Sequence, residues 1–420
     1  MTKFVIFGVG GIGSYHRAAV ERQEKIGRAR LIAVADPTAD RMPAQKAELE
    51  SRGVRWHMDY RDLLRRETDA QAVIIATPIP FHYEMAKACI ERGVFVNLEK
   101  PPVPLIQQLE SLIAAAGARH VSVGFQMIGS RSVQALKSLV TEGRIGELRE
   151  IRAGGCWPRL DNYYSRARWA GKMMLDGKPV MDGPATNALA HLIHSIMFLA
   201  AEGRHDFAVP VEVEGELYRA RRIESYDAAC LRGRFASRIE FSLAVTHATK
   251  LPLPFQFEVR GTDGWARLSN DGAVLETSCG VRLDEPETTQ QLIDRDYDRL
   301  LDVIEGRQER FGTRLKDTRG YVGATNGMFV SSGVIHDIDP AFVRPWQGEG
   351  GGGFDVLNLR EAVEESLLTG KLFSEQKCPW AVARPATVSL DGLEHRMAEK
   401  MPVELRMPGS ASWRSGADAL

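Results

Sequence analysis

The first sixteen residues constrain the fold of this chain more than any other stretch. Residues 3–7 (KFVIF) are predicted to form a short buried strand, and a helix-forming run follows from residue 14. Between them lie Gly8, Gly10, Gly11, Ile12 and Gly13. In such a turn Gly8 permits a tight bend, Gly10 leaves room for a pyrophosphate, and Gly13 lets helix and strand pack closely. The helix N-terminus adds unpaired amides and a partial positive charge. A glycine-rich turn without a ligand is the alternative.

A carboxylate follows the second predicted strand, Leu31 to Ala35. Asp36 stands twenty-three residues past Gly13, where a side chain can accept bonds from ribose hydroxyls and repel a 2′-phosphate. This context predicts dinucleotide binding, with NAD favoured over NADP. Arg41 leaves NADP open, because an arginine just past this strand can still hold a 2′-phosphate.

Further apolar strands, at 72–76, 94–98 and 120–124, alternate with helical segments over the first 125 residues. This pattern predicts a parallel, doubly wound sheet. The carboxyl ends of such strands line a ligand crevice. The remaining candidate cofactor contacts lie at or just past these ends: Thr77, Pro78, His82, Glu99, Lys100 and Gln126.

The tetrapeptide EKPP, at 99–102, directly follows one of these strands. Its two prolines remove two amide donors and fix the backbone path, so Lys100 projects from a stiff turn. A surface lysine is most often only a solvated charge. The position of Lys100 in the crevice nevertheless favours a catalytic role.

From residue 147 the pattern changes to long alternating segments, at 147–153, 211–220, 228–245, 255–260 and 265–276. Consecutive strands joined by short turns predict a largely antiparallel sheet, open on one face. The fold class is therefore α/β, with an N-terminal Rossmann sheet and a C-terminal α+β domain. We expect a dinucleotide-binding domain at 1–125, a substrate-binding and oligomerisation domain at 126–375, and an extension at 376–420.

The segment 157–178 interrupts this sheet and is rich in aromatic residues and arginine. Aromatic rings can stack on sugar rings, while arginines bond hydroxyls or carboxylates. For each residue, a loop packed on the sheet edge is the alternative. The candidate substrate contacts here are Trp157, Tyr163, Tyr164, Arg168 and Trp169.

A second interruption, at 184–198, is predicted to be a helix with Asp182 available as its cap. Asn187, His191 and His194 are spaced i, i+4 and i+7, so they share one face of an otherwise apolar helix. Such a polar stripe favours a ligand, and we expect all three residues to contact the substrate. No metal site is predicted, because no acidic ligand motif accompanies the two histidines.

Composition narrows the classes of function. At 420 residues the chain is long for one core, and a formal net charge of -1 gives no electrostatic footprint for nucleic acid or an anionic membrane. No apolar stretch reaches the length of about eighteen residues that a membrane span needs, and no signal-like leader precedes the first strand, so we expect a cytoplasmic protein. Five scattered cysteines without CxxC spacing predict reduced, mostly buried thiols.

Two later stretches are expected to lack regular structure. Residues 347–354 contain four consecutive glycines and no following GK[ST], which favours a flexible connector over a phosphate loop. The small polar residues at 408–420 are expected to be disordered.

Together these motifs resemble those of the Gfo/Idh/MocA oxidoreductases. That family is similar in the order of its parts, namely a glycine turn with a nearby histidine, a TP...H segment, EKP, a helix carrying DxGxH, and a late ES..TGK. The corresponding residues here are His16, Thr77, Pro78, His82, Glu99, Lys100, Pro101, Asn187, Leu189, His191, Glu365, Ser366, Thr369, Gly370 and Lys371. The match covers roughly residues 1–375, and EKP is its most specific part.

The resemblance implies that Lys100 and His191 flank the nicotinamide C4 and the reacting carbinol. It also implies a homo-oligomer, a dimer or a tetramer, built from the open face of the second sheet. The family's aspartate four residues before the histidine is Asn187 here, and the aspartate three residues after it is His194. An amide can hold a substrate hydroxyl, but it cannot stabilise an imidazolium as a carboxylate would. The implied catalytic set is Lys100, His191 and Asn187.

Three hypotheses for the function follow. The leading one is hydride transfer between NAD and a secondary hydroxyl of a sugar, glycoside or cyclitol, in which His191 takes the hydroxyl proton and Lys100 supplies positive charge. The second is a redox-neutral enzyme that oxidises a glycoside, eliminates the aglycone and returns the hydride. The third is a non-catalytic dinucleotide sensor. Tightly retained NAD and turnover without net NADH would distinguish the second from the first.

Overall fold

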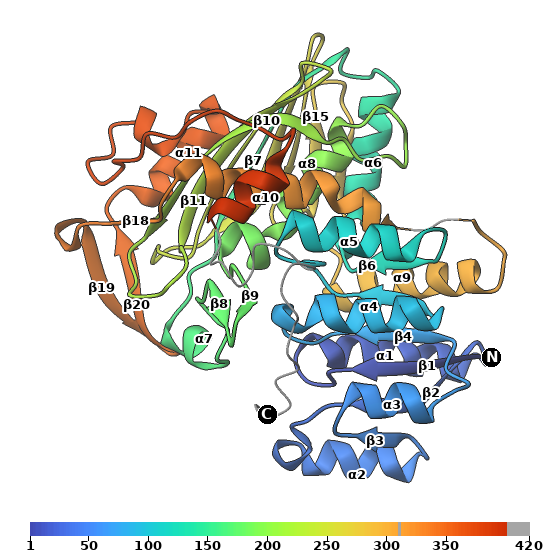
Figure 1. Cartoon of the computed structure of the whole chain (residues 1–420). Coiled ribbons are helices and arrows are strands. Elements are labelled where there is room, and N and C mark those ends of the chain that lie inside the picture. The colour runs from blue at the N-terminus through green and yellow to red at the C-terminus, as the bar shows by residue number, and fades with distance from the viewer. Residues whose placement is uncertain (310–311, 401–420) are drawn as a thin grey trace.

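The computed structural model describes residues 1–309 and 312–400, and two β-sheets organise them. In Figure 1 the first sheet lies at the lower right with the N-terminus, and the larger second sheet lies at the upper left. The first is mostly parallel and the second mostly antiparallel, so the predicted α/β class is confirmed. The tail predicted to be disordered, 408–420, lies outside the described residues.

The first sheet has seven strands in the order β17-β6-β5-β4-β1-β2-β3, all parallel except β17. Its strands are β1 (Thr2–Phe7), β2 (Ala29–Ala35), β3 (Arg55–His57), β4 (Ala72–Ile75), β5 (Phe95–Leu98), β6 (Val121–Val123) and β17 (Thr313–Arg314). The strand order reverses between β1 and β4. Ligands of such sheets bind beyond the carboxyl ends of the strands at this reversal.

Helices cover both faces of this sheet, because the side chains of β1 alternate between two apolar clusters. Phe4 and Ile6 pack with the helices of one face, and Val5 and Phe7 with those of the other. The first face carries α1 (Ile12–Lys25) and α2 (Pro43–Ser51); the second carries α3 (Tyr60–Arg66), α4 (His82–Arg92) and α5 (Ile106–Ala116).

The first sheet also recruits elements from late in the chain. The helix α9 (Thr289–Ile304) packs on α1, and its Tyr297 and Leu301 are buried in the same cluster as Phe4. The strand β17 pairs antiparallel with β6. The domain boundary expected at residue 125 stays a prediction, and the covering of α1 depends on residues far beyond it.

The second sheet runs in the order β16-β15-β14-β13-β7-β12-β11-β10-β18, and β21 also pairs with β10. Its neighbouring strands are antiparallel except for the pairs β7–β12 and β10–β18. The strands are β7 (Leu148–Cys156), β10 (Pro210–Arg219), β11 (Ala228–Phe235), β12 (Glu240–Thr246), β13 (Leu253–Gly261), β14 (Trp265–Ser269), β15 (Val274–Thr277), β16 (Arg282–Asp284), β18 (His336–Asp337) and β21 (Val388–Ser389).

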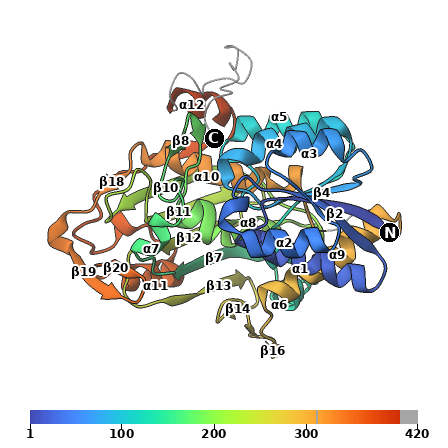
Figure 2. The ribbon, with the colours of Figure 1, turned by 90° about the horizontal axis from the view of Figure 1, so that it is seen from below.

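Three helices pack on the inner face of the second sheet, toward the first sheet (Figure 2). They are α6 (Arg131–Thr141), α8 (Ala190–Ala200) and α10 (Arg319–Ser332). Near the end of the described chain, α12 (Leu393–Lys400) contacts α10 and α5. The short helix α7 (Asp161–Ser165) and the hairpin β8 (Met174–Leu175) and β9 (Lys178–Pro179) follow β7.

The outer face of the second sheet is covered at one end, so the prediction of an open face was wrong there. The helix α11 (Leu359–Thr369) packs on β7 and β12, and the following segment buries Phe373 and Trp380. These side chains form a second core with Tyr218 and Cys230. This packing is favourable because it removes the apolar ends of the strands from water. The predicted homo-oligomer stays a prediction.

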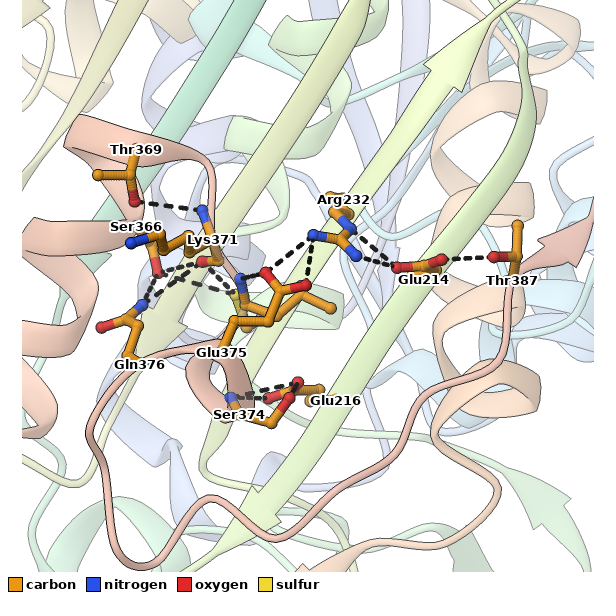
Figure 3. A network of polar contacts seen from close by, with 12 residues as sticks. Glu214, Glu216, Arg232, Ser366, Thr369, Lys371, Ser374, Glu375, Gln376 and Thr387 are labelled. Carbon is orange, nitrogen blue, oxygen red and sulfur yellow. Dashed lines mark hydrogen bonds and ion pairs between the residues drawn. The ribbon is translucent and has the colours of Figure 1, made fainter.

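A polar network attaches the segment after α11 to β10 and β11 (Figure 3). Glu216, buried on β10, accepts hydrogen bonds from the amide of Ser374 at 3.2 Å and from its hydroxyl at 2.5 Å. Arg232 on β11 donates to Glu375 at 2.9 Å and to Glu214 at 2.8 Å. Burial raises the pKa of Glu216, and the Ser374 hydroxyl opposes this shift.

The glycine run at 347–354 forms an ordered hairpin, which corrects the prediction of a flexible connector. The hairpin consists of β19 (Val343–Gly348) and β20 (Gly351–Val356). Its glycines lie directly on the segment that contains α7. A Cβ at Gly350 would stand 2.5 Å from Asn162, and one at Gly353 would stand 2.7 Å from Leu160. The glycines therefore permit close packing rather than flexibility.

All five cysteines are free thiols, as predicted, and Cys89, Cys156 and Cys230 are buried. No helix among residues 1–309 and 312–400 is long and apolar enough to span a membrane. Within the same residues, no cluster of three or more His, Cys, Asp and Glu side chains is arranged to hold a metal ion.

Candidate active site

The glycine turn between β1 and α1 has the geometry that a pyrophosphate site needs. Gly8 has φ +82°, and a Cβ there would stand 2.7 Å from the carbonyl oxygen of Ala76. A Cβ at Gly13 would stand 2.1 Å from the carbonyl oxygen of Gly8. At Gly10 the nearest atom is the Met42 sulfur, 3.8 Å away, so space is open there. The first and last glycines thus serve packing, and Gly10 leaves room for a ligand.

The N-terminus of α1 is suited to an anion. Helix α1 starts at Ile12 after Gly11, and no side chain in the described chain caps it. Its first turn contains no acidic residue. The amides of Gly13 and Ser14 already donate to the carbonyl oxygens of Gly10 and Gly11, at 2.9 and 3.1 Å. The amide of Ile12 and the partial positive charge of the helix are available to a ligand.

Asp36 lies beside this turn at the end of β2. Its carboxylate accepts hydrogen bonds from the amide of Val9 at 3.0 Å and from the amide and hydroxyl of Thr38 at 2.9 and 2.6 Å. Oδ1 accepts both Thr38 bonds, so Oδ2, which accepts only the Val9 amide, keeps acceptor capacity for a ribose hydroxyl. Arg41, the candidate for a 2′-phosphate, is exposed nearby in the chain.

Two residues that were expected to contact the cofactor, His82 and Glu99, form hydrogen bonds within the protein at the carboxyl ends of the strands. His82 is buried between the carbonyl oxygens of Thr77 and Pro101, at 2.8 Å from each. It ties the loop after β4 to the loop after β5. Burial lowers the pKa of His82, so its neutral ring donates to one carbonyl at a time. Pro78 precedes the same turn.

Glu99 is likewise an internal anchor. Its carboxylate lies 2.9 Å from Nε2 of His16 and accepts from the amide of Lys100 at 3.0 Å. The other nitrogen of His16 lies 2.9 Å from the hydroxyl of Tyr297 on α9. Burial opposes ionisation of Glu99, but the His16 hydrogen bond keeps its pKa below the usual value. The network connects α1, β5 and α9 behind the crevice.

Lys100 crosses from the first sheet to the second. Its Nζ donates to the carbonyl oxygen of Asn187 at 2.7 Å and lies 3.4 Å from the side-chain oxygen of the same residue. Burial lowers the pKa of Lys100, while the charges of Glu99 and Asp182 raise it. The EKPP turn therefore places the Lys100 ammonium group beside Asn187, in the segment 184–198. The sequence predicted the stiff turn but not this contact.

The predicted helix at 184–198 is broken into two pieces. Residues Pro184–Ala188 form a π-helical turn, and α8 begins only at Ala190. Asn187 therefore lies outside α8 and does not share a helical face with His191. Its side-chain amide donates to Asp182 at 2.8 Å, which directs its oxygen toward Lys100.

Asp182 has a different role from the cap that was expected. Its carboxylate accepts from the amide of Gly171 at 2.8 Å and from Asn187, and it does not cap the following turn. Burial raises the pKa of Asp182, whereas its hydrogen bonds and the charges of Arg166 and Lys100 lower it. A carboxylate near Lys100 is thus retained, five residues before Asn187 in the chain.

His191 is a neutral base in a buried setting. Burial lowers its pKa well below the ordinary value, and the neighbouring charge of Lys100 lowers it further. Its Nδ1 is buried and has no hydrogen-bond partner among the described residues. The ring makes an edge contact with Phe125, with centroids 5.6 Å apart. Gln126, next in the chain, is also buried, and its side-chain oxygen lacks a partner in the part of the chain described.

His194 belongs to the core rather than to a ligand-facing stripe. It is fully buried and stacks on Phe125 and Phe207, with ring centroids 4.0 and 4.7 Å away. Its Nε2 lies 2.9 Å from the hydroxyl of Thr313. Burial lowers its pKa to about 3, so it stays neutral. Aromatic side chains and Thr313 enclose the ring, so the structure places it in the core and not at a substrate contact.

The aromatic and arginine segment is arranged around stacked cations. The guanidinium carbons of Arg159 and Arg166 lie 4.8 and 3.5 Å from the ring centroid of Tyr163. Tyr164 carries Arg221 at 4.6 Å. The rings of Trp157 and Trp169 also lie under arginines, Arg159 at 5.6 Å and Arg166 at 5.0 Å respectively. Arg168 is exposed and paired with Asp176 at 2.9 Å, on the solvent side.

Two residues near Lys100 and Tyr163, Asp182 and His247, could not be identified as site residues from the sequence. Asp182 directly precedes the Gly-Pro pair at 183–184, and its link to Asn187 depends on the π-helical turn. His247 follows β12 and meets Tyr163 with ring centroids 5.7 Å apart. No motif in the sequence marks it.

Models of two domain families match this chain. The model described as "Oxidoreductase family, NAD-binding Rossmann fold" matches residues 2–126, and the GFO/IDH/MocA C-terminal domain matches residues 133–267. Inositol 2-dehydrogenase 4 of Saccharopolyspora erythraea is 33% identical over 145 residues, which cover 34% of this chain and 41% of that protein. Inositol 2-dehydrogenase of Streptomyces avermitilis is 34% identical over 147 residues and is covered to 42% of its length. The chain thus spans about two fifths of the length of these curated relatives.

Solved structures share the fold over a longer part of the chain. WlbA dehydrogenase from Bordetella pertussis, in complex with NADH and UDP-GlcNAcA, has a TM-score of 0.66 and 22% identity, and the match covers 78% of this chain and 95% of that one. Levoglucosan dehydrogenase in complex with NADH has a TM-score of 0.64 and 18% identity, with coverage of 78% and 95%. With both domain models matched in order, the chain belongs to the Gfo/Idh/MocA family of NAD(P)-dependent oxidoreductases.

Proposed function

We propose that the protein is an NAD-dependent dehydrogenase that acts on a secondary hydroxyl of a sugar, glycoside or cyclitol. The observation that carries this proposal is the convergence of Lys100, Asn187 and His191 beside the strand ends of the first sheet. The relatives named inositol 2-dehydrogenase and levoglucosan dehydrogenase support the substrate class.

The residues around the glycine turn fit a bound NAD. The uncapped N-terminus of α1 and the space at Gly10 suit a pyrophosphate, and Asp36 suits the ribose hydroxyls. A carboxylate there disfavours a 2′-phosphate, so NAD is the expected cofactor. When bound, NAD supplies the acceptor for a hydride.

The side chains of the crevice divide the remaining work. Burial lowers the pKa of His191 well below the ordinary value, so its neutral ring can accept the hydroxyl proton; because Nδ1 is buried, Nε2 is the nitrogen proposed for this contact. The ammonium of Lys100 can stabilise the alkoxide that forms as this proton leaves. Asn187, oriented by Asp182, positions Lys100.

The test measures NADH absorbance with a panel of cyclitols and sugars, including myo-inositol and matched neutral and acidic hexoses. We expect NADH formation with at least one of them, and its loss in His191→Ala. The mass of small molecules that copurify with the protein guides the panel. NAD binding without turnover on any member would favour the sensor, and turnover without net NADH would favour the redox-neutral enzyme.

A further inference from the structure

Two arginines near Lys100 have no carboxylate to neutralise them. Among residues 1–309 and 312–400, neither Arg159 nor Arg166 forms an ion pair, and Arg166 donates only to the carbonyl oxygen of Tyr163, at 3.1 Å. Arg221, from the same region, is paired with Asp161.

Aromatic rings hold these two arginines in place. Both guanidinium groups lie over Tyr163, and Trp157 and Trp169 each carry one of them as well. Guanidinium–ring contacts of this kind fix the position of a cation without cancelling its charge. Because the cations occupy the rings, these aromatic residues serve as supports for arginines rather than as platforms for sugar stacking.

The charges of Arg159 and Arg166 act on Lys100. Arg159 and Arg166 both lower the pKa of Lys100, after burial, so their fields extend to its ammonium group. The nearby carboxylate of Asp182 is already engaged by Gly171 and Asn187. The groups that act on one another here are three cations, Lys100, Arg159 and Arg166, and two carboxylates, Glu99 and Asp182, so positive charge is in excess.

Unused polar atoms lie in the same cluster. The Nε of Arg159 and the Nε2 of His247 are buried and lack a partner among the described residues, and His247 is only 3% exposed. Nδ1 of His247 lies 2.7 Å from the carbonyl oxygen of Trp157, which assigns the proton to Nδ1 and leaves Nε2 as an acceptor. Orphaned buried groups of this kind are costly unless a ligand satisfies them.

We propose that the substrate carries an anionic group, a carboxylate or a phosphate, that Arg159 and Arg166 bind, while His247 accepts a hydrogen bond from a neighbouring hydroxyl. This rests on the proposed function and specifies its substrate class as an acidic sugar or cyclitol derivative. Guanidinium groups bind both anions through paired N–H donors. Arg159 is partly buried and Arg166 is exposed, and a neutral sugar would leave both guanidinium groups without an anionic partner.

The test compares matched pairs that differ only in charge. The probes are D-glucuronate and D-glucose 6-phosphate, each with D-glucose, and D-galacturonate with D-galactose, all titrated calorimetrically into the protein loaded with NADH. We expect at least one acidic member to bind about tenfold or more tightly than its neutral partner. The phosphate probe distinguishes the two anion types.

Variants then locate the site. In Arg159→Gln and Arg166→Gln the preference for the acidic member should fall toward one, while NAD affinity is unchanged. The control is Arg149→Gln, an exposed arginine at the other end of β7 that pairs with Glu147 at 2.7 Å, and it should keep the preference. Equal binding of neutral and acidic partners, a preference that survives both variants, or no binding of any acidic probe would overturn the proposal.

The same probes separate this proposal from the proposed function. Arginine-dependent binding of an acidic sugar without NADH formation from any probe would retain the anion site and reject the dehydrogenase. Oxidation of a neutral sugar with unchanged kcat/KM in both arginine variants would do the reverse.

Discussion

Lys100 acquires its chemical role from its surroundings. The EKPP turn could be predicted to make it project rigidly from a strand end, because two prolines fix the backbone. Its contact with Asn187 could not, because that contact joins segments 87 positions apart. Asp182 was expected only as a helix cap, because its bond to Asn187 depends on the π-helical turn. Hydrogen bonds within one segment leave a pattern in the sequence, whereas contacts between segments depend on the assembled fold.

Replacing Lys100 with methionine should reduce turnover while leaving the cofactor site intact. In the proposed function the ammonium stabilises charge that develops mainly in the transition state, so Lys100→Met should lower kcat by about a hundredfold or more. Steady-state kinetics and calorimetric titration with NAD measure the two effects. A correctly folded variant with full activity would return Lys100 to the status of a solvated lysine.

Adding a carboxylate near Lys100 and removing one should shift the pH dependence of kcat/KM in opposite directions. An opposite charge favours the protonated amine, so Asn187→Asp should raise the pKa of Lys100 and move the alkaline limb of kcat/KM upward by about one pH unit. Asp182→Asn removes a charge that raises this pKa, so the limb should move downward.

The control for this pair is Asp69→Asn, which removes an exposed carboxylate paired with Lys3. Its pH profile should match that of the unmodified protein. If the two active-site variants moved the limb in the same direction, or if neither moved it, another group would be titrating. A rise confined to the acidic limb in Asn187→Asp would point to His191 instead.

At the scale of elements, most helices and strands of the first sheet follow from local patterns. Gly93 and Gly370, for example, close α4 and α11 in left-handed conformations, as a C-cap glycine predicts. The π-helical turn at Pro184–Ala188 was not predicted. A single-helix pattern of apolar residues cannot reveal it, because the register changes within one turn.

The glycine turn allows cofactor contact and packing to be tested separately. Gly10→Ala should leave Tm unchanged, because the nearest atom to the new Cβ is 3.8 Å away, but should weaken NAD binding by about tenfold or more. Gly13→Ala should also lower Tm by about several degrees, since its Cβ meets the Gly8 carbonyl oxygen. Thermal unfolding and NAD titration distinguish the two. Normal NAD affinity in Gly10→Ala would mean that no pyrophosphate approaches there.

At the scale of the whole molecule, the two sheets could be predicted from the sequence. The packing of α9 on α1 and the pairing of β17 with β6 in the first sheet could not. The apolar face of α9 shows only that it packs somewhere. Its partner, α1, lies some 275 positions earlier, as the Gln290–Tyr15 contact shows. The same limit applies to the cover on the outer face of the second sheet.

The fragment 1–125 should therefore fold poorly by itself. Without α9 it loses Tyr297, Leu300 and Leu301, which bury the α1 side of the sheet, and the hydroxyl beside His16. We expect weak or non-cooperative thermal unfolding and NAD binding reduced about tenfold or more against the full chain. Calorimetry of both proteins tests this. A cooperative fragment with full affinity would show that the first 125 residues are a self-sufficient unit.

The glycine hairpin also makes the crevice adjustable from a distance. Its backbone touches α7, and the amide of Gly352 donates to Asp161 at 2.8 Å, so the loop carrying Tyr163 and Arg166 rests on it from behind. A methyl group added at one of the glycines 350–353 would displace that loop without itself lying in the proposed substrate site. Substitutions in the hairpin should therefore change the position of the proposed anion site as directly as substitutions in the α7 loop itself.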